Sequence, residues 1–419
     1  MRIRSRRRIA FLFVASSIAL SGCWDRVEID QRGFIVGVGV DAVIQEVDES
    51  SAEEESGSTP SGEQTNSASN KKQNKKAKYK VTYQVVTPSG MKAENANAQP
   101  TAAYFHLTVE GTTFSTMEAN LAQRMSRAPF FEHLKVLIFS EAVARRPGDF
   151  AEAIDYFLRD SQMRRSTKVM VTPNKASEIL STQPPGERLP SAYLELVSSN
   201  GANSSRILPH TRIGEVQESL LKNKSFGIQT VSNGSRTYST LNGTAVFSGR
   251  SNRLIGFLDG RETAGLNFLR DSIKGGHIEF PYGDEGRGVF IVQRMTRRMR
   301  VSFGKDGLPA FDYHIEVQGS LNEAYQIPDT LSEKTLYRMD EYVGQSIKQL
   351  IESAIVKLQK QYRCDVIELA DYMSRKHHRW WSKHRGQWER GDDLFSQVPI
   401  HVQVKAHIHR TGNINISEE

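Results

Sequence analysis

The hydrophobic pattern of this 419-residue chain predicts short buried strands, amphipathic helices and one long helix. Gly33 to Val40 is an apolar, β-branched run bounded by turn signals, and such a run predicts a buried strand. From Thr116 to Pro173, helix and strand patterns alternate in short order. Such alternation is typical of a sheet with helices packed on it. The first part of the chain is therefore expected to be a mixed α/β structure.

Strands lengthen toward the carboxyl end. Gly288 to Gln293 and Arg297 to Phe303 predict two strands with a turn between them, in a mostly antiparallel sheet. From residue 331 to residue 362, apolar residues recur at steps of three, four or seven, which predicts one apolar stripe along about eight helical turns. The strand Ile400 to His409 follows in the same unit. We therefore interpret this segment as a long helix laid across a sheet, with a partner-binding coiled coil as the alternative.

Breaks in the pattern predict three domains. The expected fold class is α+β or mixed α/β. Pro184-Pro185-Gly186 ends the alternating region, and Gly275-Gly276 precedes the longer strands. The predicted domains are residues 23–184, 185–276 and 277–419.

One segment of the first domain, residues 45–78, has almost no large apolar side chains. It carries an acidic block, a Ser/Gly/Asn stretch and a lysine block, and it cannot bury enough apolar surface to offset the entropy of ordering. We predict a disordered insertion there. A basic arm that touches anionic lipid is the weaker alternative.

The first 22 residues have the layout of a signal peptide. Five arginines and no acidic residue come first, and an apolar run from Ile9 to Leu20 follows. That run is too short to cross a bilayer, which takes about 20 helical residues. Leu20-Ser21-Gly22-Cys23 resembles the lipobox of bacterial lipoproteins. We predict cleavage before Cys23 and a lipid on its sulfur, with ordinary signal cleavage as the alternative.

Processing changes the charge and the cysteine count. Loss of residues 1–22 removes five positive charges, so the formal net charge falls from +7 to +2. The mature chain then has no basic footprint for nucleic acid. With Cys23 lipidated, Cys364 is the only remaining thiol. No intramolecular disulfide can form, and the core alone must stabilise the fold.

No catalytic, cofactor-binding or metal-binding site is predicted. Gly37-Val38-Gly39 lacks the third glycine of a dinucleotide fingerprint, and neither a Walker-type loop nor a nucleophile elbow is present. The three histidines of the last strand are interpreted as a solvated face rather than zinc ligands.

Two clusters invite a functional interpretation. Arg298 and Arg300 lie on one face of a predicted strand that also carries Arg294 and Arg297, and we favour a solvated face over a contact with lipid or a partner. Trp380, Trp381 and Trp388 lie among basic residues, a composition also found at membrane interfaces. For the tryptophans we favour burial in the core.

Cys23-Trp24-Asp25, followed by Glu28 and the strand end Val38 to Asp41, resembles the Ger(x)C family of spore-germination lipoproteins, the C subunits of nutrient germinant receptors. Further blocks follow in the order of the family: Ala128 to Phe139, Asp155 to Asp160, Arg164, Gly243 to Phe247, Gly256 to Glu262 and the tryptophan segment. The chain departs from the usual pattern in the insertion and at Val27 and Ile29, which flank Glu28.

The resemblance implies three mixed α/β domains without enzymatic activity, on the outer face of the inner spore membrane. It also implies two protein partners, a polytopic A subunit and a transporter-like B subunit. We hypothesise that Trp24, Asp25 and Glu28 dock the first strand close to the membrane. The alternative function is a solute-binding lipoprotein that delivers a small ligand to a transporter. Such proteins need two doubly wound lobes, and helix–strand alternation is clear only before Pro184.

Overall fold

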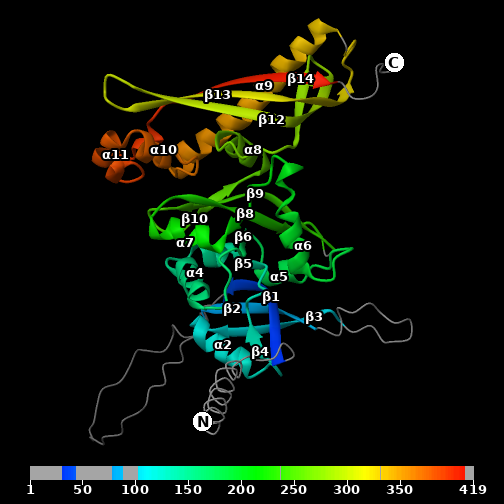
Figure 1. The fold of residues 1–419 in the computed structure, drawn as a ribbon, viewed down its shortest axis with the longest axis vertical. Helices are drawn as coiled ribbons and strands as arrows, with labels where there is room; N and C mark the ends of the chain where they lie inside the picture. The colour runs from blue at the N-terminus through cyan, green and yellow to red at the C-terminus, as the bar shows by residue number, and fades with distance from the viewer. Residues whose placement is uncertain (1–30, 44–77, 88–101, 236, 331, 411–419) are drawn as a thin grey trace, which may run out of the picture.

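The computed structural model describes residues 31–43, 78–87, 102–235, 237–330 and 332–410. These residues form two sheets with packed helices, stacked along the long axis of the molecule (Figure 1). The predicted signal peptide, Cys23, Trp24, Asp25, Glu28 and nearly all of the predicted insertion lie outside the described residues. Among the described helices, none has the length and apolar character that a membrane span requires.

In the described part of the chain, ten strands form one large sheet with the order β10-β9-β8-β6-β5-β1-β2-β3, while β4 pairs with β1 and β7 with β6. The strands are β1 (Arg32–Ala42), β2 (Tyr79–Val86), β3 (Tyr104–Gly111), β4 (Ala128–Phe130), β5 (Val136–Ser140), β6 (Lys168–Thr172), β7 (Thr211–Arg212), β8 (Phe226–Asn233), β9 (Ser239–Ser248) and β10 (Arg253–Leu258). The central neighbours β1, β5, β6 and β8 run parallel, and antiparallel pairs flank them.

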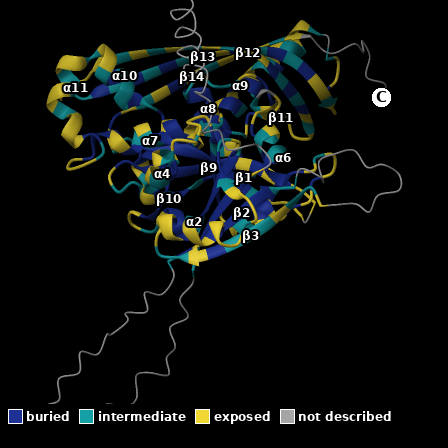
Figure 2. Cartoon of the chain, turned by 60° about the horizontal axis from the view of Figure 1, so that its bottom comes forward, coloured by how far each residue is buried: buried dark blue, intermediate teal, exposed yellow. Residues whose placement is uncertain are grey.

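Helices cover both faces of the large sheet. They are α2 (Phe114–Ala122), α3 (Glu141–Arg145), α4 (Asp149–Arg159), α5 (Ala176–Leu180), α6 (Pro190–Val197) and α7 (Ile213–Leu221), with a 3-10 turn η4 (Asn200–Ala202). Phe150 of α4 and Val216 of α7 pack into the core on one face, and Ile179 of α5 and Leu194 of α6 pack on the other. Figure 2 shows the buried residues concentrated along the strands between these helices. The predicted alternation of helices and strands is confirmed.

The large sheet continues past residue 184, because β8, β9 and β10 add to the strands that precede that position. Segments 23–184 and 185–276 therefore contribute to one sheet. The three-domain division stays a prediction.

A second sheet of four strands, within the described residues, has the order β11-β12-β13-β14. Its strands are β11 (His277–Tyr282), β12 (Gly286–Phe303), β13 (Pro309–Tyr325) and β14 (Ile400–Arg410). The turn predicted between Gln293 and Arg297 is wrong, because β12 is continuous. A register shift between Val292 and Arg294 breaks the alternation there, and a β-bulge of this kind imitates a strand end in the sequence.

The last strand also corrects the predicted pairing. β11, β12 and β13 are antiparallel as expected, but β14 runs parallel to β13. Parallel strands need a crossover connection, usually helical. Here the connection contains α9 (Glu333–Val356), a π-helical turn η5 (Lys357–Tyr362), α10 (Leu369–Lys376), α11 (His378–His384), η6 (Arg385–Gln387) and η7 (Leu394–Ser396).

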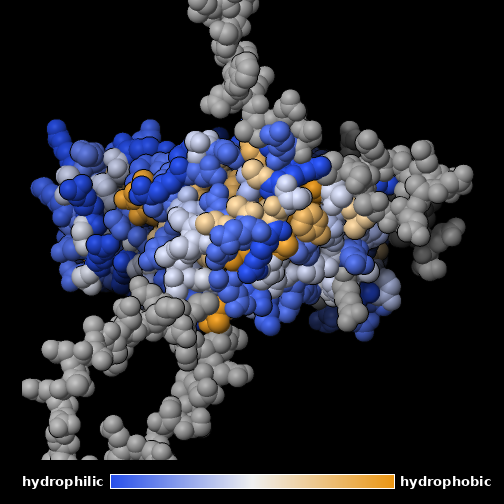
Figure 3. Space-filling view, turned by 90° about the horizontal axis from the view of Figure 1, so that it is seen from below, coloured by the Kyte–Doolittle hydropathy of each residue, from blue (hydrophilic) through white to orange (hydrophobic). Residues whose placement is uncertain are grey.

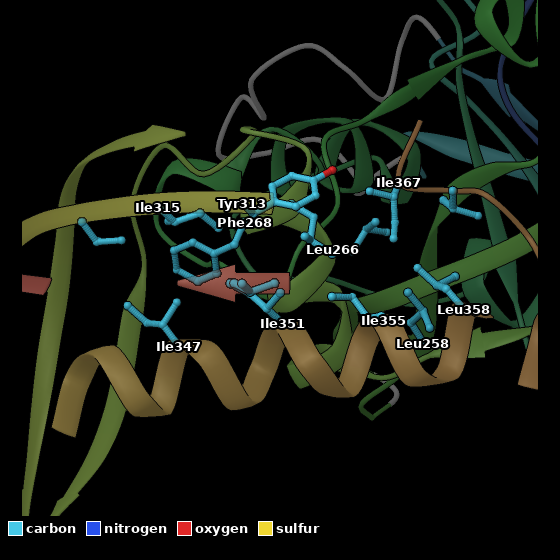
Figure 4. Close-up of a cluster of buried hydrophobic side chains, with 14 of the residues drawn as sticks. Leu258, Leu266, Phe268, Tyr313, Ile315, Ile347, Ile351, Ile355, Leu358 and Ile367 are labelled. Carbon is cyan, nitrogen blue, oxygen red and sulfur yellow. The ribbon is translucent and has the colours of Figure 1, made fainter. Parts of the chain in front are cut away.

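The long helix lies across the second sheet, as predicted. Met339, Val343 and Ile347 of its stripe are fully buried. In Figure 4, side chains of α9 point toward Leu266 and Phe268 of α8 (Gly260–Leu269) and toward Tyr313 and Ile315 of β13. One core therefore joins the long helix, the second sheet and α8.

Candidate functional site

The described chain begins at the lower end of the molecule in Figure 1. There the first residues of β1 pair in parallel with β4, with Arg32 opposite Ala128 and Phe34 opposite Phe130. Gln31 is eight residues after Cys23, and eight extended residues reach at most about 30 Å. A lipid on Cys23 would therefore hold this end of the fold close to the membrane.

An aromatic cluster fixes the start of β1 to β4. The ring of Phe34 lies 5.7 Å from that of Phe130 and 5.4 Å from that of His133, centroid to centroid. The guanidinium of Arg32 lies 4.0 Å from the centroid of Phe130. The sequence singled out the block from Ala128 to Phe139, but not its contact with β1, because the pairing joins segments about 100 residues apart.

A second cluster lies where the large sheet meets the second half of the chain. Gly243 has φ +101°, and a Cβ there would lie 2.5 Å from the carbonyl oxygen of Leu258. A Cβ on Gly256 would lie 2.5 Å from the hydroxyl oxygen of Tyr362, which donates a 2.9 Å hydrogen bond to the carbonyl of Phe257. The blocks from Gly243 to Phe247 and from Gly256 to Glu262 therefore serve close packing at this junction.

Ion pairs cross the same junction. Glu262 pairs with Lys357 at 2.6 Å and Arg270 pairs with Glu368 at 2.6 Å. These four side chains are partly shielded from solvent. The two halves of the described chain thus contact each other through polar groups as well as through their shared apolar core.

The tryptophan segment is mostly structural. Trp388 is 3% exposed, and its indole nitrogen donates a 2.9 Å hydrogen bond to Asp365. Trp381 packs edge-on against Trp388 with centroids 5.6 Å apart, and the indole nitrogen of Trp380 donates to the carbonyl of Gly307. The core interpretation is confirmed for Trp388, whereas Trp380 and Trp381 are half-buried.

A buried and a half-buried carboxyl group beside Trp388, those of Asp365 and Glu389, were not anticipated from the sequence. Asp365 is 2% exposed and accepts hydrogen bonds from the backbone N–H groups of Leu369 and Ala370 at 3.1 and 2.7 Å. Its own N–H donates to the carboxyl of Glu389. Burial raises the pKa of Asp365, and burial followed by the Asp365 charge raises the pKa of Glu389 to about 7.

The Glu389→Gln substitution should flatten the pH dependence of stability. Between pH 4.5, the ordinary pKa of the group, and about 7, the folded protein keeps a proton that the unfolded chain releases, so stability falls as pH rises. Glutamine removes this penalty, and at pH 8 the variant should be more stable by about 2–3 kcal/mol. Urea unfolding from pH 5 to pH 8 measures this change. Equal slopes for Glu389→Gln and the parent would contradict it, and the exposed-site variant Glu316→Gln serves as the control.

The arginine and histidine clusters lie on exposed faces. Arg298 and Arg300 are exposed on the outer face of β12, as interpreted, whereas Arg297 points inward and donates to the carbonyl of Leu269. His401 contacts Asp312 at 2.9 Å. The described residues contain no group of three potential metal ligands.

A groove of about 930 Å³ lies between α8, α9 and the strands β11 and β12. Arg206, Arg261, Arg287, Glu279 and Glu323 are among its lining residues. Its charges are mixed, and Arg206 and Glu279 partly neutralise each other at 3.6 Å.

Two family models match the chain. The model described as the spore germination protein N-terminal domain matches residues 25–232, and the one described as spore germination B3/GerAC like, C-terminal, matches residues 242–412. Together they span almost all of the chain after the predicted cleavage site.

Curated relatives match over nearly their whole length. Spore germination protein YndF of Bacillus subtilis (strain 168) is 26% identical over 407 residues, which cover 95% of each chain. Spore germination protein B3 of the same organism is 24% identical over 420 residues, or 99% of this chain and 100% of the relative. The crystal structure of the GerBC protein has a TM-score of 0.57 and 21% identity, and covers 79% of this chain and 93% of that one. The fold is shared with that structure.

Proposed function

This chain belongs to the family of spore germination proteins whose N-terminal and GerAC-like C-terminal models it matches, and from that premise we propose that it is the lipid-anchored C subunit of a nutrient germinant receptor. It acts by association with the polytopic A subunit and the transporter-like B subunit, on the outer face of the inner spore membrane. Its role is to let the complex trigger germination, without catalysis of its own.

The observation that carries this proposal is the similarity to germination proteins along almost the full chain, in both halves. The geometry supports the anchored form, because β1 begins nine residues after Cys23 and at one end of the molecule. A lipid there leaves the rest of the described surface accessible to partner subunits.

Solute delivery is the second candidate, because the groove of about 930 Å³ is within the size range of small-ligand sites. A solute-binding lipoprotein needs two doubly wound lobes around its cleft. The second half of this chain instead has a four-stranded sheet dominated by a long antiparallel hairpin. The receptor subunit is therefore the better supported function.

Affinity purification of the tagged chain from detergent-solubilised spore membranes tests the proposal. The A and B subunits should copurify, and Asp25→Ala combined with Glu28→Ala should lower their recovery severalfold if these acids dock the first strand near the membrane. Glu316→Ala, an exposed acid on β13, is the control and should leave recovery unchanged. A chain that purifies without membrane partners, from spores that germinate normally when it is deleted, would refute the proposal.

A further inference from the structure

We propose that one surface of this protein, the basal face, lies directly on an anionic bilayer. The basal face consists of Arg32 and Phe34 of β1, residues 123–127 after α2, and Ala128–Phe130 of β4. This inference rests on the lipid anchor of the proposed function. It adds which surface meets the membrane and by what chemistry.

Apolar side chains are gathered at this end of the molecule. Figure 3, seen from below, shows a hydrophobic patch near the middle of the lower surface with hydrophilic side chains around it. On the basal face, Phe34, Met125 and Pro129 are half-buried and Ala128 is exposed. Met125 lies across β1, because a Cβ on Gly33 would come within 2.2 Å of its terminal methyl group. These side chains offer apolar area to the interfacial layer of a bilayer.

Three arginines of the basal face have no carboxylate partner among the described residues. Arg32 contacts the Phe130 ring, and Arg124 donates a 3.0 Å hydrogen bond to the carbonyl of Thr108. Arg127 is exposed, and within the described part of the chain it makes no ion pair. Each cation near an anionic lipid surface strengthens binding by roughly fivefold.

Two described acids near the basal face do not pair with its arginines. Glu132 pairs with Arg164 at 3.5 Å, and Glu118 accepts a hydrogen bond from the hydroxyl of Tyr156. The basal face as defined contains three arginines and no acidic residue, so it carries a net positive charge that complements anionic phospholipid.

The position of the lipid anchor favours the basal face over the other surfaces of the protein. Cys23 precedes the first described residue by eight positions, so its lipid lies within about 30 Å of the start of β1. The second sheet lies at the opposite end of the long axis in Figure 1. Its outer face mixes charges of both signs: Arg298 is exposed opposite His314, and the exposed Glu316 lies opposite Lys405. An apolar patch at the anchored end, with three arginines that have no carboxylate partner in the described part of the chain, fits a bilayer.

A single-cysteine label tests the contact. The lipidated chain has one other native thiol, Cys364, which is 2% exposed, so an introduced surface cysteine can be labelled selectively. Ala128→Cys on the basal face and Ser302→Cys on exposed β12 are the matched pair. Each full-length lipidated variant carries an environment-sensitive fluorophore and is reconstituted on vesicles of phosphatidylcholine and phosphatidylglycerol that contain brominated lipid.

The label at residue 128 should be quenched at least threefold more than the label at residue 302. Arg32→Glu combined with Arg127→Glu should abolish this difference while the protein still floats with the vesicles. Equal quenching at both positions, with the protein floating, would overturn the basal face but not the anchor. Burial of the residue-128 label without lipid quenching would also overturn it, because another subunit or a second copy would then cover the surface. Failure to float would instead refute the lipidation, and with it this inference.

Discussion

Replacement of Cys23 by alanine should release the protein from the membrane and abolish the nutrient response of the spores. Only a thiolate is nucleophilic enough to form the thioether, so alanine removes every acyl chain at once. Two or three acyl chains anchor a protein stably, whereas a single chain gives only weak, reversible binding. The described residues offer no spanning helix to replace them. Membrane fractionation with immunodetection, together with a germination assay on the same spores, measures both losses.

Cys364→Ala is the matched control for this experiment. Its thiol is buried, that burial raises its pKa to about 12, and it lies outside the predicted lipobox. The control protein should stay with the membrane. A Cys23→Ala protein that also remained in the membrane fraction would contradict both the anchor and the role assigned to the anchored form.

Asp365→Ala should lower the free energy of unfolding by about 3–5 kcal/mol. The substitution leaves the indole N–H of Trp388 and the backbone N–H groups of Leu369 and Ala370 buried without their acceptor. It also opens space beside the most buried tryptophan of the second half. Urea unfolding followed by tryptophan fluorescence measures the loss.

Two companion variants make the result specific. Asp365→Asn keeps the shape and one acceptor oxygen, so its loss should lie between those of alanine and the parent protein. Asp155→Ala removes an exposed carboxylate whose ion-pair partner among the described residues is Arg159 on the same helix, and exposed pairs of this kind contribute little to stability. Similar destabilisation by Asp155→Ala and Asp365→Ala would mean that the buried hydrogen-bond network adds no more to the free energy of unfolding than an exposed ion pair does.

The strands and helices were largely predictable because burial leaves a periodic trace in the sequence. The run around Gly33 and the stripe of α9 are both buried where the pattern placed them. Strand direction leaves no such trace, since side chains alternate in the same way in parallel and antiparallel strands. The direction of β14 was missed for this reason. The continuity of β12 was missed because its bulge interrupts the alternation of side chains that marks a strand.

The candidate site, too, could be predicted from the sequence only in part. The lipobox is a local motif, and it can be found without the fold. The contact of β4 with β1 depends on pairing between distant segments, and the burial of Asp365 and the partial burial of Glu389 depend on tertiary packing. Acidic residues are almost never fully buried unless they are paired, so a sequence reading places them in solvent. Here the backbone N–H groups of α10 and the Trp388 indole supply the partners.

The continuity of the large sheet bears on how this family can be recombined. The two family models divide the chain between residues 232 and 242, yet β8 and β9 on either side of that division are antiparallel neighbours in one sheet. In a chimera joined there, β8 from one parent would have to form backbone hydrogen bonds with β9 from the other parent. A crossover near Gly276, after α8 and before β11, would keep that sheet within one parent.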